Sequence, residues 1–142
     1  YITFAKIKLE CCVMLKGIIF KEILLVALGG ALGSVCRYLL AALVQQQAGT
    51  VFPIGTMSVN VAGCLLIGVV TGWAGGHTPL SAEARLLLVT GFCGGFTTFS
   101  TFANESLSLY HGHVLSAALY IGGSVMLGIL SAALGLHLGR ML

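Results

Sequence analysis

Charged residues are scarce in this chain, and their scarcity argues against a soluble protein. Only 8% of the 142 residues are Asp, Glu, Lys or Arg, whereas 58% are hydrophobic. A soluble domain carries about a quarter charged residues, so too few are present here to cover a surface that faces water. Because the mean hydropathy is also high, at +1.05, the sequence predicts an integral membrane protein. The net charge of +3 is too small to indicate a nucleic-acid partner.

The cysteines lack the spacing of a disulfide framework or a metal site. Cys11 and Cys12 are adjacent, and Cys36, Cys64 and Cys93 each lie inside an apolar run, with no CxxC pair. Free cysteines in such surroundings behave as small apolar residues. We therefore predict that the cysteines pack between helices.

Four long apolar runs divide the chain: Ile23–Val44, Ile54–Ala74, Leu86–Leu109 and Val114–Leu138. Each is close to the ~20 residues that a helix needs to cross about 30 Å of hydrocarbon. Backbone polar groups must be satisfied within the segment there, which favours helices. We predict an all-α membrane protein with four transmembrane helices, at about residues 22–45, 54–75, 84–110 and 113–140.

The start of the chain differs in character from the rest of the sequence. The first residue is Tyr1, and residues 1–13 do not resemble the apolar pattern downstream. We predict that Met14 is the natural start and that residues 14–142 form a single four-helix transmembrane domain. Residues 1–13 are then a non-native or over-called N-terminal extension.

Small residues recur at intervals of four in three of the runs. Such spacing lets helix backbones approach closely in a membrane. The predicted close-contact positions are Gly29 and Gly33, then Gly68, Gly72 and Gly76, then Gly135 and Gly139.

The third run contains an irregular segment, Gly91–Thr101, with three glycines and four hydroxyl-bearing residues. Each glycine costs about 1 kcal/mol relative to alanine in a helix. We predict that the third helix is broken at mid-membrane, which would free backbone carbonyl and amide groups. Such groups are tolerated only where they are buried in protein, bind an ion or line a wet cavity.

Arg37 and Asn60 lie at membrane depth, where polar side chains are costly and are therefore candidate functional residues. Arg37 either snorkels, hydrogen-bonds to backbone carbonyls or attracts an anion. Asn60 either donates hydrogen bonds to a dehydrating anion or holds two helices together. Thr56, four residues earlier, shares the helix face of Asn60.

Phe99 and Phe102 are three residues apart and share a helix face. A phenylalanine pair in a membrane helix is usually packing. Neighbouring hydroxyl groups favour a second interpretation, in which the positive ring edges meet an anion. These hydroxyls belong to Thr97, Thr98, Ser100 and Thr101. In the fourth run, Tyr120 and Ser124 form a polar stripe.

Three segments, in this order and spacing, resemble the Fluc (CrcB-type) fluoride channel family. Gly29–Tyr38 is similar to its GGxxGxxxRY segment, Gly55–Gly63 to GTxxxNxxG, and Gly91–Phe102 to GxxGGxTTFSTF. The similarity extends from about residue 24 to residue 139. It implies an antiparallel dimer with two fluoride pores at its interface and a central structural sodium ion. The implied function is passive export of fluoride across the cell inner (plasma) membrane, which reduces fluoride toxicity, without an enzymatic activity.

The resemblance also implies roles for individual residues. The candidate fluoride-pore residues are Phe99, Phe102, Asn60, Thr56, Thr98, Ser100, Tyr120 and Ser124. At the vestibule, the matching residues are Arg37 and Glu105. Sodium would be held by the backbone carbonyls of Gly94 and Thr97. Gly128 stands where some members have serine, so the polar stripe is shorter here.

One rival is a small four-helix antiporter of the multidrug type. Such a protein requires a carboxylate in its first span to exchange protons for a cation, and this chain has Arg37 there instead. A non-transporting packing subunit and an intramembrane enzyme are further alternatives. The first would gain nothing from an irregular mid-membrane segment, and no Ser/His/Asp set lies at matching depth for the second.

The basic residues predict an orientation. In the four-span arrangement Lys16, Lys21, Arg85 and Arg140 fall on one side, which places both termini in the cytoplasm. A protein that inserts in both orientations should show almost no such bias. An antiparallel homodimer and a heterodimer with an oppositely oriented paralogue therefore both remain open.

Overall fold

The computed structural model describes residues 2–76 and 80–142, and this part of the chain contains helices and no strand. In chain order the elements are α1 (Ile2–Ala48), α2 (Ile54–Gly76), α3 (Ala82–Arg85), the π-helix η1 (Leu86–Cys93), α4 (Gly94–Phe96), α5 (Phe99–Gly112) and α6 (Val114–Met141). Four stretches of the described residues are long and apolar enough to cross a membrane. They are Ile19–Ala48, Ile54–Gly75, Ala82–Gly112 and Val114–Met141. The predicted all-α class with four spans is confirmed.

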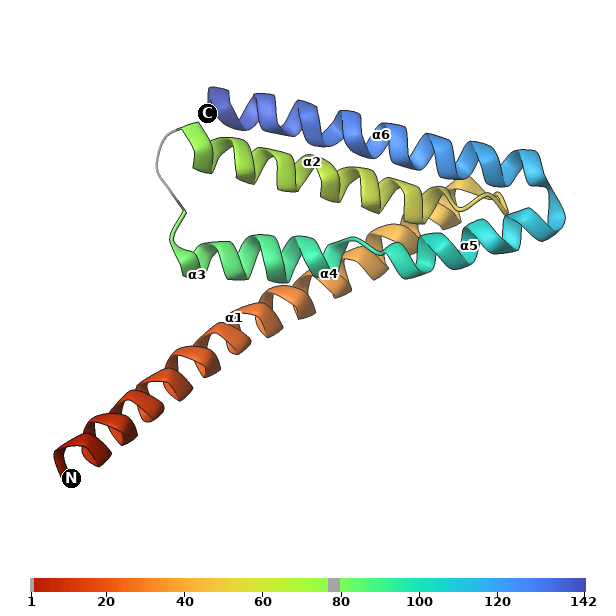
Figure 1. Ribbon diagram of the computed structural model, residues 1–142. Helices are drawn as coiled ribbons and strands as arrows, with labels where there is room; N and C mark the ends of the chain where they lie inside the picture. The colour runs from red at the N-terminus through yellow and green to blue at the C-terminus, as the bar shows by residue number, and fades with distance from the viewer. Residues whose placement is uncertain (1, 77–79) are drawn as a thin grey trace.

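The spans pack as two pairs, and the two members of each pair run in the same direction. Figure 1 shows α2 and α6 side by side and running in the same direction, so that the C-terminus lies near the end of α2. The first span crosses the third, and α1 packs on η1 and α4. Alternate spans of a chain that crosses the membrane repeatedly must run in the same direction. Each pair therefore joins spans that are not neighbours in sequence.

Glycines permit both close pairings, as their spacing predicted. A Cβ atom added at Gly33 would collide with the Phe92 carbonyl of η1, and one added at Gly139 would collide with the Val69 carbonyl of α2. Backbone-to-backbone packing of this kind replaces the hydrophobic driving force that is absent between helices in lipid. Equivalent close contacts occur at Gly29, Gly68, Gly72 and Gly135. The surroundings of Gly76 lie outside the described contacts.

The third span is interrupted locally while staying joined. It contains the π-helical turns of η1, the short α4, and then Thr97 and Thr98 with extended dihedral angles (φ −97°, ψ 156° and φ −145°, ψ 112°) before α5 begins. The bend across the span is only 17°. The prediction of a broken helix is therefore not confirmed as a division into two separate half-helices. The Thr97 amide still donates to the Cys93 carbonyl at 3.1 Å, so the irregularity consists of the Thr97 carbonyl and the backbone groups of Thr98, which need partners outside the helix.

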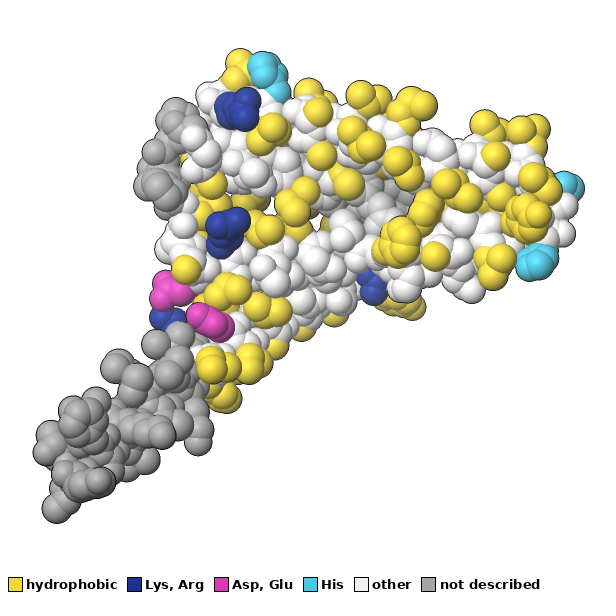
Figure 2. Space-filling view, in the orientation of Figure 1, with side chains coloured by type: hydrophobic (Ala, Val, Ile, Leu, Met, Phe, Trp, Pro, Cys, Tyr) yellow, Lys and Arg dark blue, Asp and Glu magenta, His cyan; other side chains and the backbone are white. Residues whose placement is uncertain are grey.

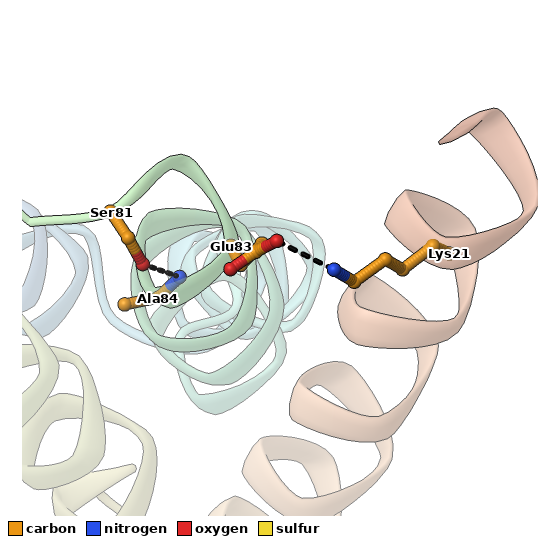
Figure 3. A network of polar contacts seen from close by, with 4 residues as sticks. All are labelled: Lys21, Ser81, Glu83 and Ala84. Atoms are coloured by element: carbon orange, nitrogen blue, oxygen red, sulfur yellow. Dashed lines mark hydrogen bonds and ion pairs between the residues drawn. The ribbon is translucent and has the colours of Figure 1, made fainter. Parts of the chain in front are cut away.

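One end of the bundle carries a polar link between the first and third spans. Figure 3 shows Lys21 reaching Glu83, with Nζ 2.6 Å from Oε1, and the Ser81 hydroxyl accepting from the Ala84 amide at 3.1 Å. Both members of the ion pair are exposed, so the pair contributes little to stability. Figure 2 shows acidic side chains and most of the basic ones gathered at this end, whereas hydrophobic side chains are spread over the rest of the view.

The proposal that residues 1–13 stand outside the four-helix transmembrane domain stays a prediction. His77, Thr78 and Pro79, which belong to the expected turn between the second and third spans, lie outside the described residues.

Candidate functional site

Asn60 hydrogen-bonds to the backbone at the interruption of the third span. Its Oδ1 accepts from the Thr98 amide at 2.8 Å, and its Nδ2 donates to the Thr98 carbonyl at 3.1 Å. One carboxamide thus satisfies both backbone groups of an extended residue that has no helical partners. Since an unpaired backbone group is costly inside a membrane, Asn60 stabilises the extended conformation there. The second hydrogen on Nδ2 remains available for another acceptor.

Carbonyl groups around the interruption have different partners. The Gly95 carbonyl accepts from Arg37 Nε at 3.2 Å and from the Ser34 hydroxyl at 3.5 Å. Arg37 therefore hydrogen-bonds to backbone, which was one of the roles that the sequence left open. In a continuous helix the Gly94 carbonyl would accept from the Thr98 amide, but that amide donates to Asn60.

The Thr97 carbonyl loses its helical donor in a similar way. The Thr101 amide, four residues later, donates at 3.3 Å to the Thr98 hydroxyl, which caps α5. Among the described residues, the carbonyls of Gly94 and Thr97 consequently have no hydrogen-bond donor. Two unpartnered carbonyls three residues apart are hard oxygen ligands, suited to a small cation such as sodium.

A cavity of about 350 Å³ lies beside the interruption. No lining residue carries a charge, and most of the lining is apolar. Six of the predicted site residues line it together: Asn60, Gly94, Thr97, Thr98, Phe99 and Phe102. Gly63 also lines this cavity, and a Cβ atom there would collide with the Thr97 side chain. The close packing of α2 on the interruption therefore depends on a glycine at that position.

Four aromatic rings form a row that starts at this cavity. Phe99 and Phe102 have centroids 5.8 Å apart, Phe102 and Tyr120 are 5.2 Å apart, and Phe52 meets Tyr120 at 5.6 Å with an interplanar angle of 87°. Offset and edge-to-face arrangements of this kind are the favourable ones. Tyr120 is fully buried, whereas Phe99 is 80% exposed in the single chain. The row therefore runs from an open surface into the packed interior.

Glu105 receives two hydroxyl hydrogen bonds. Thr56 donates to Oε1 at 2.8 Å, and Tyr120 donates to Oε2 at 2.7 Å. Charge-assisted bonds of this kind are stronger than neutral ones. Each hydroxyl has one hydrogen, so neither Thr56 nor Tyr120 can donate to another acceptor while it is bound to Glu105. The Tyr120 contact also links Glu105 to the aromatic row.

A second cavity, of about 520 Å³, lies on the Glu105 side of the interruption. Three predicted site residues, Arg37, Thr56 and Glu105, line it. The structure thus divides nine of the predicted residues between two cavities, and Phe102 of the first group is in ring contact with Tyr120, which donates to Glu105 of the second.

Ser100, Tyr120 and Ser124 line neither cavity. Ser100 is exposed, and its hydroxyl lies 3.5 Å from that of Thr98. The Ser124 hydroxyl is buried, and the described residues provide no hydrogen-bond partner for it. A buried hydroxyl without a partner is unusual, so Ser124 remains a candidate for contact with an ion or water.

Sequence reasoning missed several residues that the structure brings to the site. Thr101 was noted as a neighbouring hydroxyl but not as a candidate pore residue; it lines the second cavity and accepts from the Thr98 hydroxyl at 2.9 Å. Cys64 and Cys93 line the first cavity, although their sequence context indicated packing alone. Gln45, near the end of α1, lines the second cavity, and Phe52, in the loop between the first two spans, contacts the Tyr120 ring. Only Phe52 carried any signal, as an aromatic residue directly before a proline.

These features define a class: a small helical membrane protein with four spans, whose polar groups gather around an interruption at membrane depth. Within that class the chain belongs to the CrcB family. The model of the family described as CrcB-like protein, Camphor Resistance (CrcB), matches residues 24–136.

Curated relatives cover most of the chain. A protein of Nitratidesulfovibrio vulgaris (strain Miyazaki F) is 50% identical over 122 residues, which are 85% of this chain and 98% of the relative. A Phocaeicola vulgatus protein is 50% identical over 121 residues, which are 84% of this chain and 99% of the relative. A third, from Acidobacterium capsulatum, is 47% identical over 116 residues, covering 81% and 93%. Each of the three is named fluoride-specific ion channel FluC.

Proposed function

We propose that this protein is a fluoride-selective channel of the plasma membrane that passively exports fluoride from the cytoplasm. The observation that carries the proposal is the cavity that joins the Asn60 amide to the rings of Phe99 and Phe102 without a charged residue in its lining. The names of relatives that are about half identical over nearly their whole length support the same assignment.

Such a lining suits a small, strongly hydrated anion. A fixed cation would hold fluoride too tightly for release, and an aliphatic wall would not compensate for lost water. Ring edges and an amide N–H lie between these limits, each contributing on the order of 1 kcal/mol. The free hydrogen on Asn60 Nδ2 and the edges of the two rings are the groups that an anion would meet.

The driving force requires no coupling chemistry. Hydrogen fluoride crosses membranes as a neutral acid and dissociates in the cytoplasm. The negative-inside potential then favours anion exit by about 2.3 kcal/mol per charge per 100 mV.

Glu105, Thr56 and Tyr120 form a hydrogen-bonded group, called the Glu105 cluster below, whose carboxylate opposes the passage of an anion close to it. Thr56 and Tyr120 both donate to the carboxylate. An anion at this level would meet a negative charge unless one hydroxyl turned from Glu105 towards the anion. We propose that Thr56 and Tyr120 exchange their donors between Glu105 and fluoride, which keeps the carboxylate partly neutralised throughout.

A dimer would complete the pore. Phe99 is 80% exposed in the single chain, and it stands at the opening of the uncharged cavity. We propose that a second subunit in antiparallel orientation covers this face. That subunit is either a copy of this chain or an oppositely inserted paralogue.

Sodium fits the dimer as a structural ion. The carbonyls of Gly94 and Thr97 lack donors among the described residues, and backbone carbonyls freed by a helix interruption are typical ligands of this ion. We propose that these two carbonyls, together with those of the second subunit, hold sodium between the interruptions. Bound there, the ion would satisfy oxygens that the bilayer cannot hydrate.

Fluoride efflux from liposomes tests the function. Purified protein should release trapped fluoride when a potassium ionophore sets the potential, and liposomes loaded with chloride should release little. The rival antiporter would instead move a cation in exchange for protons, driven by a proton gradient. Proton-coupled cation uptake without fluoride release would overturn the proposal.

A further inference from the structure

Gln45 is the one member of the run Gln45-Gln46-Gln47 whose side chain makes hydrogen bonds within the described part of the chain. Its Nε2 donates to the Thr50 carbonyl at 2.6 Å and to the Phe52 carbonyl at 3.1 Å. Its Oε1 accepts from the Gly55 amide at 3.0 Å. The amide thus uses both donor hydrogens and its acceptor oxygen. Its two neighbours in the run are exposed.

These bonds fix the loop between α1 and α2. The chain turns at Gly49, where φ is +59°, and the Phe52 amide donates to the Thr50 hydroxyl at 3.2 Å. Gly55 lies in the first turn of α2, whose first amides have no helical acceptor. Gln45 therefore connects the end of one span, the loop and the start of the next span through a single side chain.

Phe52 and Gly55, the two residues of this segment that Gln45 binds nearest to α2, are each connected to Glu105 through a neighbouring residue. Phe52 places its ring edge-on to Tyr120, which is fully buried and donates to Glu105 Oε2. Gly55 directly precedes Thr56, which donates to Oε1. Each residue whose hydroxyl binds the carboxylate is thus a neighbour of a residue that Gln45 binds. Tyr120 contacts the ring of Phe52, and Thr56 follows Gly55 in the chain.

We infer that Gln45 is a positioning residue for the Glu105 cluster, acting through the backbone of Phe52 and Gly55. By fixing these two points it sets the Tyr120 ring and the first turn of α2, so that both hydroxyls reach one carboxylate. The transport consequence rests on the proposed function, whereas the positioning itself is a property of the fold.

The matched pair Gln45→Met and Gln46→Met tests the inference, since each removes one glutamine amide from adjacent positions of one helix. Gln45→Met should lower the fluoride efflux rate at least about fivefold, the equivalent of one hydrogen bond, while Gln46→Met leaves the rate unchanged. Amide hydrogen exchange at Gly55 should accelerate in Gln45→Met alone. Equal exchange and equal flux in the two variants would overturn the inference.

A double-mutant cycle separates positioning from simple loop closure. If Gln45 acts through Tyr120, then Gln45→Met should lower the unfolding midpoint less in a Tyr120→Phe background than in wild type, because the Glu105 bond is already lost. Equal losses in both backgrounds would show that the side chain only closes the loop. Should Gln45→Met fail to fold, Phe52→Leu carries the same cycle. Absence of fluoride flux in wild-type liposomes would contradict the proposed function while leaving the exchange and unfolding results to decide the positioning.

Discussion

At the scale of single residues, one amide accounts for the conformation at the heart of the site. Asn60 pairs with both backbone groups of Thr98, so it has a structural task beside any contact with an anion. The sequence left these two roles as alternatives. In the structure, Oδ1 and one hydrogen on Nδ2 of Asn60 bind the Thr98 backbone, and the second hydrogen on Nδ2 is left for contact with an anion.

Replacing Asn60 by leucine should lower the stability of the protein. Two backbone groups would lose their partners at membrane depth, at a cost of about 2 kcal/mol or more. We expect a lower unfolding midpoint in detergent and a loss of fluoride efflux. Asn104→Leu is the matched control, because Asn104 is exposed. A midpoint for Asn60→Leu equal to that of the control would contradict the bracing role.

Phe99→Ile and Phe102→Ile should each stop fluoride efflux while the protein still elutes as a folded species. An aliphatic side chain fills similar space but has no positive edge to offer an anion. Phe99 is mostly exposed in the single chain, so its replacement should hardly change the packing within one subunit. Phe102 contacts two rings, and its replacement should lower the midpoint modestly.

The control for the ring variants is Phe20→Ile, which changes an exposed phenylalanine that lines neither cavity. Wild-type efflux rates in Phe99→Ile and Phe102→Ile would show that these rings serve packing alone.

At the scale of elements, the interruption depends on how tightly the neighbouring helices pack. Gly33 lies against the Phe92 backbone, and Arg37, one turn later, donates to the Gly95 carbonyl. The close approach of α1 therefore brings a donor within reach of a carbonyl near the end of α4. Packing and hydrogen bonding are coupled because both use the same short distance between backbones.

Gly33→Ala should be destabilising by about 1–3 kcal/mol, since overpacking forces the helices apart. Gly30→Ala, on the same helix, is the control, because its new Cβ would meet only the Gly91 carbonyl at 3.8 Å, an ordinary contact. Unfolding midpoints and efflux rates of the two variants, measured together, provide the comparison. If both variants unfold at the same temperature, close approach at Gly33 does not limit stability.

At the scale of the whole molecule, one chain leaves an aromatic side chain exposed and two carbonyls unpartnered at the site. The aromatic row opens onto a surface where Phe99 is exposed, and two carbonyls lack donors among the described residues. Both features are accounted for if a second subunit packs on this face with an ion between the interruptions. The proposed dimer therefore follows from unsatisfied groups as well as from exposed apolar area.

A tag at the C-terminus should report the orientation in cells. In a dual-topology homodimer, half of the tags face the periplasm, so labelling by a membrane-impermeant reagent should reach about half of the signal obtained after permeabilisation. A strictly cytoplasmic tag would exclude the antiparallel homodimer. It would favour a heterodimer with a paralogue, which co-purification from the native host would then identify.

Replacement of sodium should destabilise the dimer. We expect a lower unfolding midpoint in a buffer where a large organic cation replaces sodium, because the Gly94 and Thr97 carbonyls would then face each other without a ligand. Crystals soaked with a heavier monovalent ion should show density on the dimer axis. An empty axis together with a midpoint independent of sodium would refute the site.

The sequence alone determined the environment, the number of spans and the family. These follow from composition, from run lengths set by bilayer thickness and from three spaced motifs, all of which are local properties. The tertiary structure decided which polar groups meet. That Asn60 pairs with Thr98, and that Thr56 shares Glu105 with Tyr120, depends on contacts between separate spans. That only one of three glutamines braces the loop depends on how the chain folds back between the first two spans. Spacing along one helix assigns a face but not the neighbour opposite, because the neighbour is chosen by backbone packing between spans.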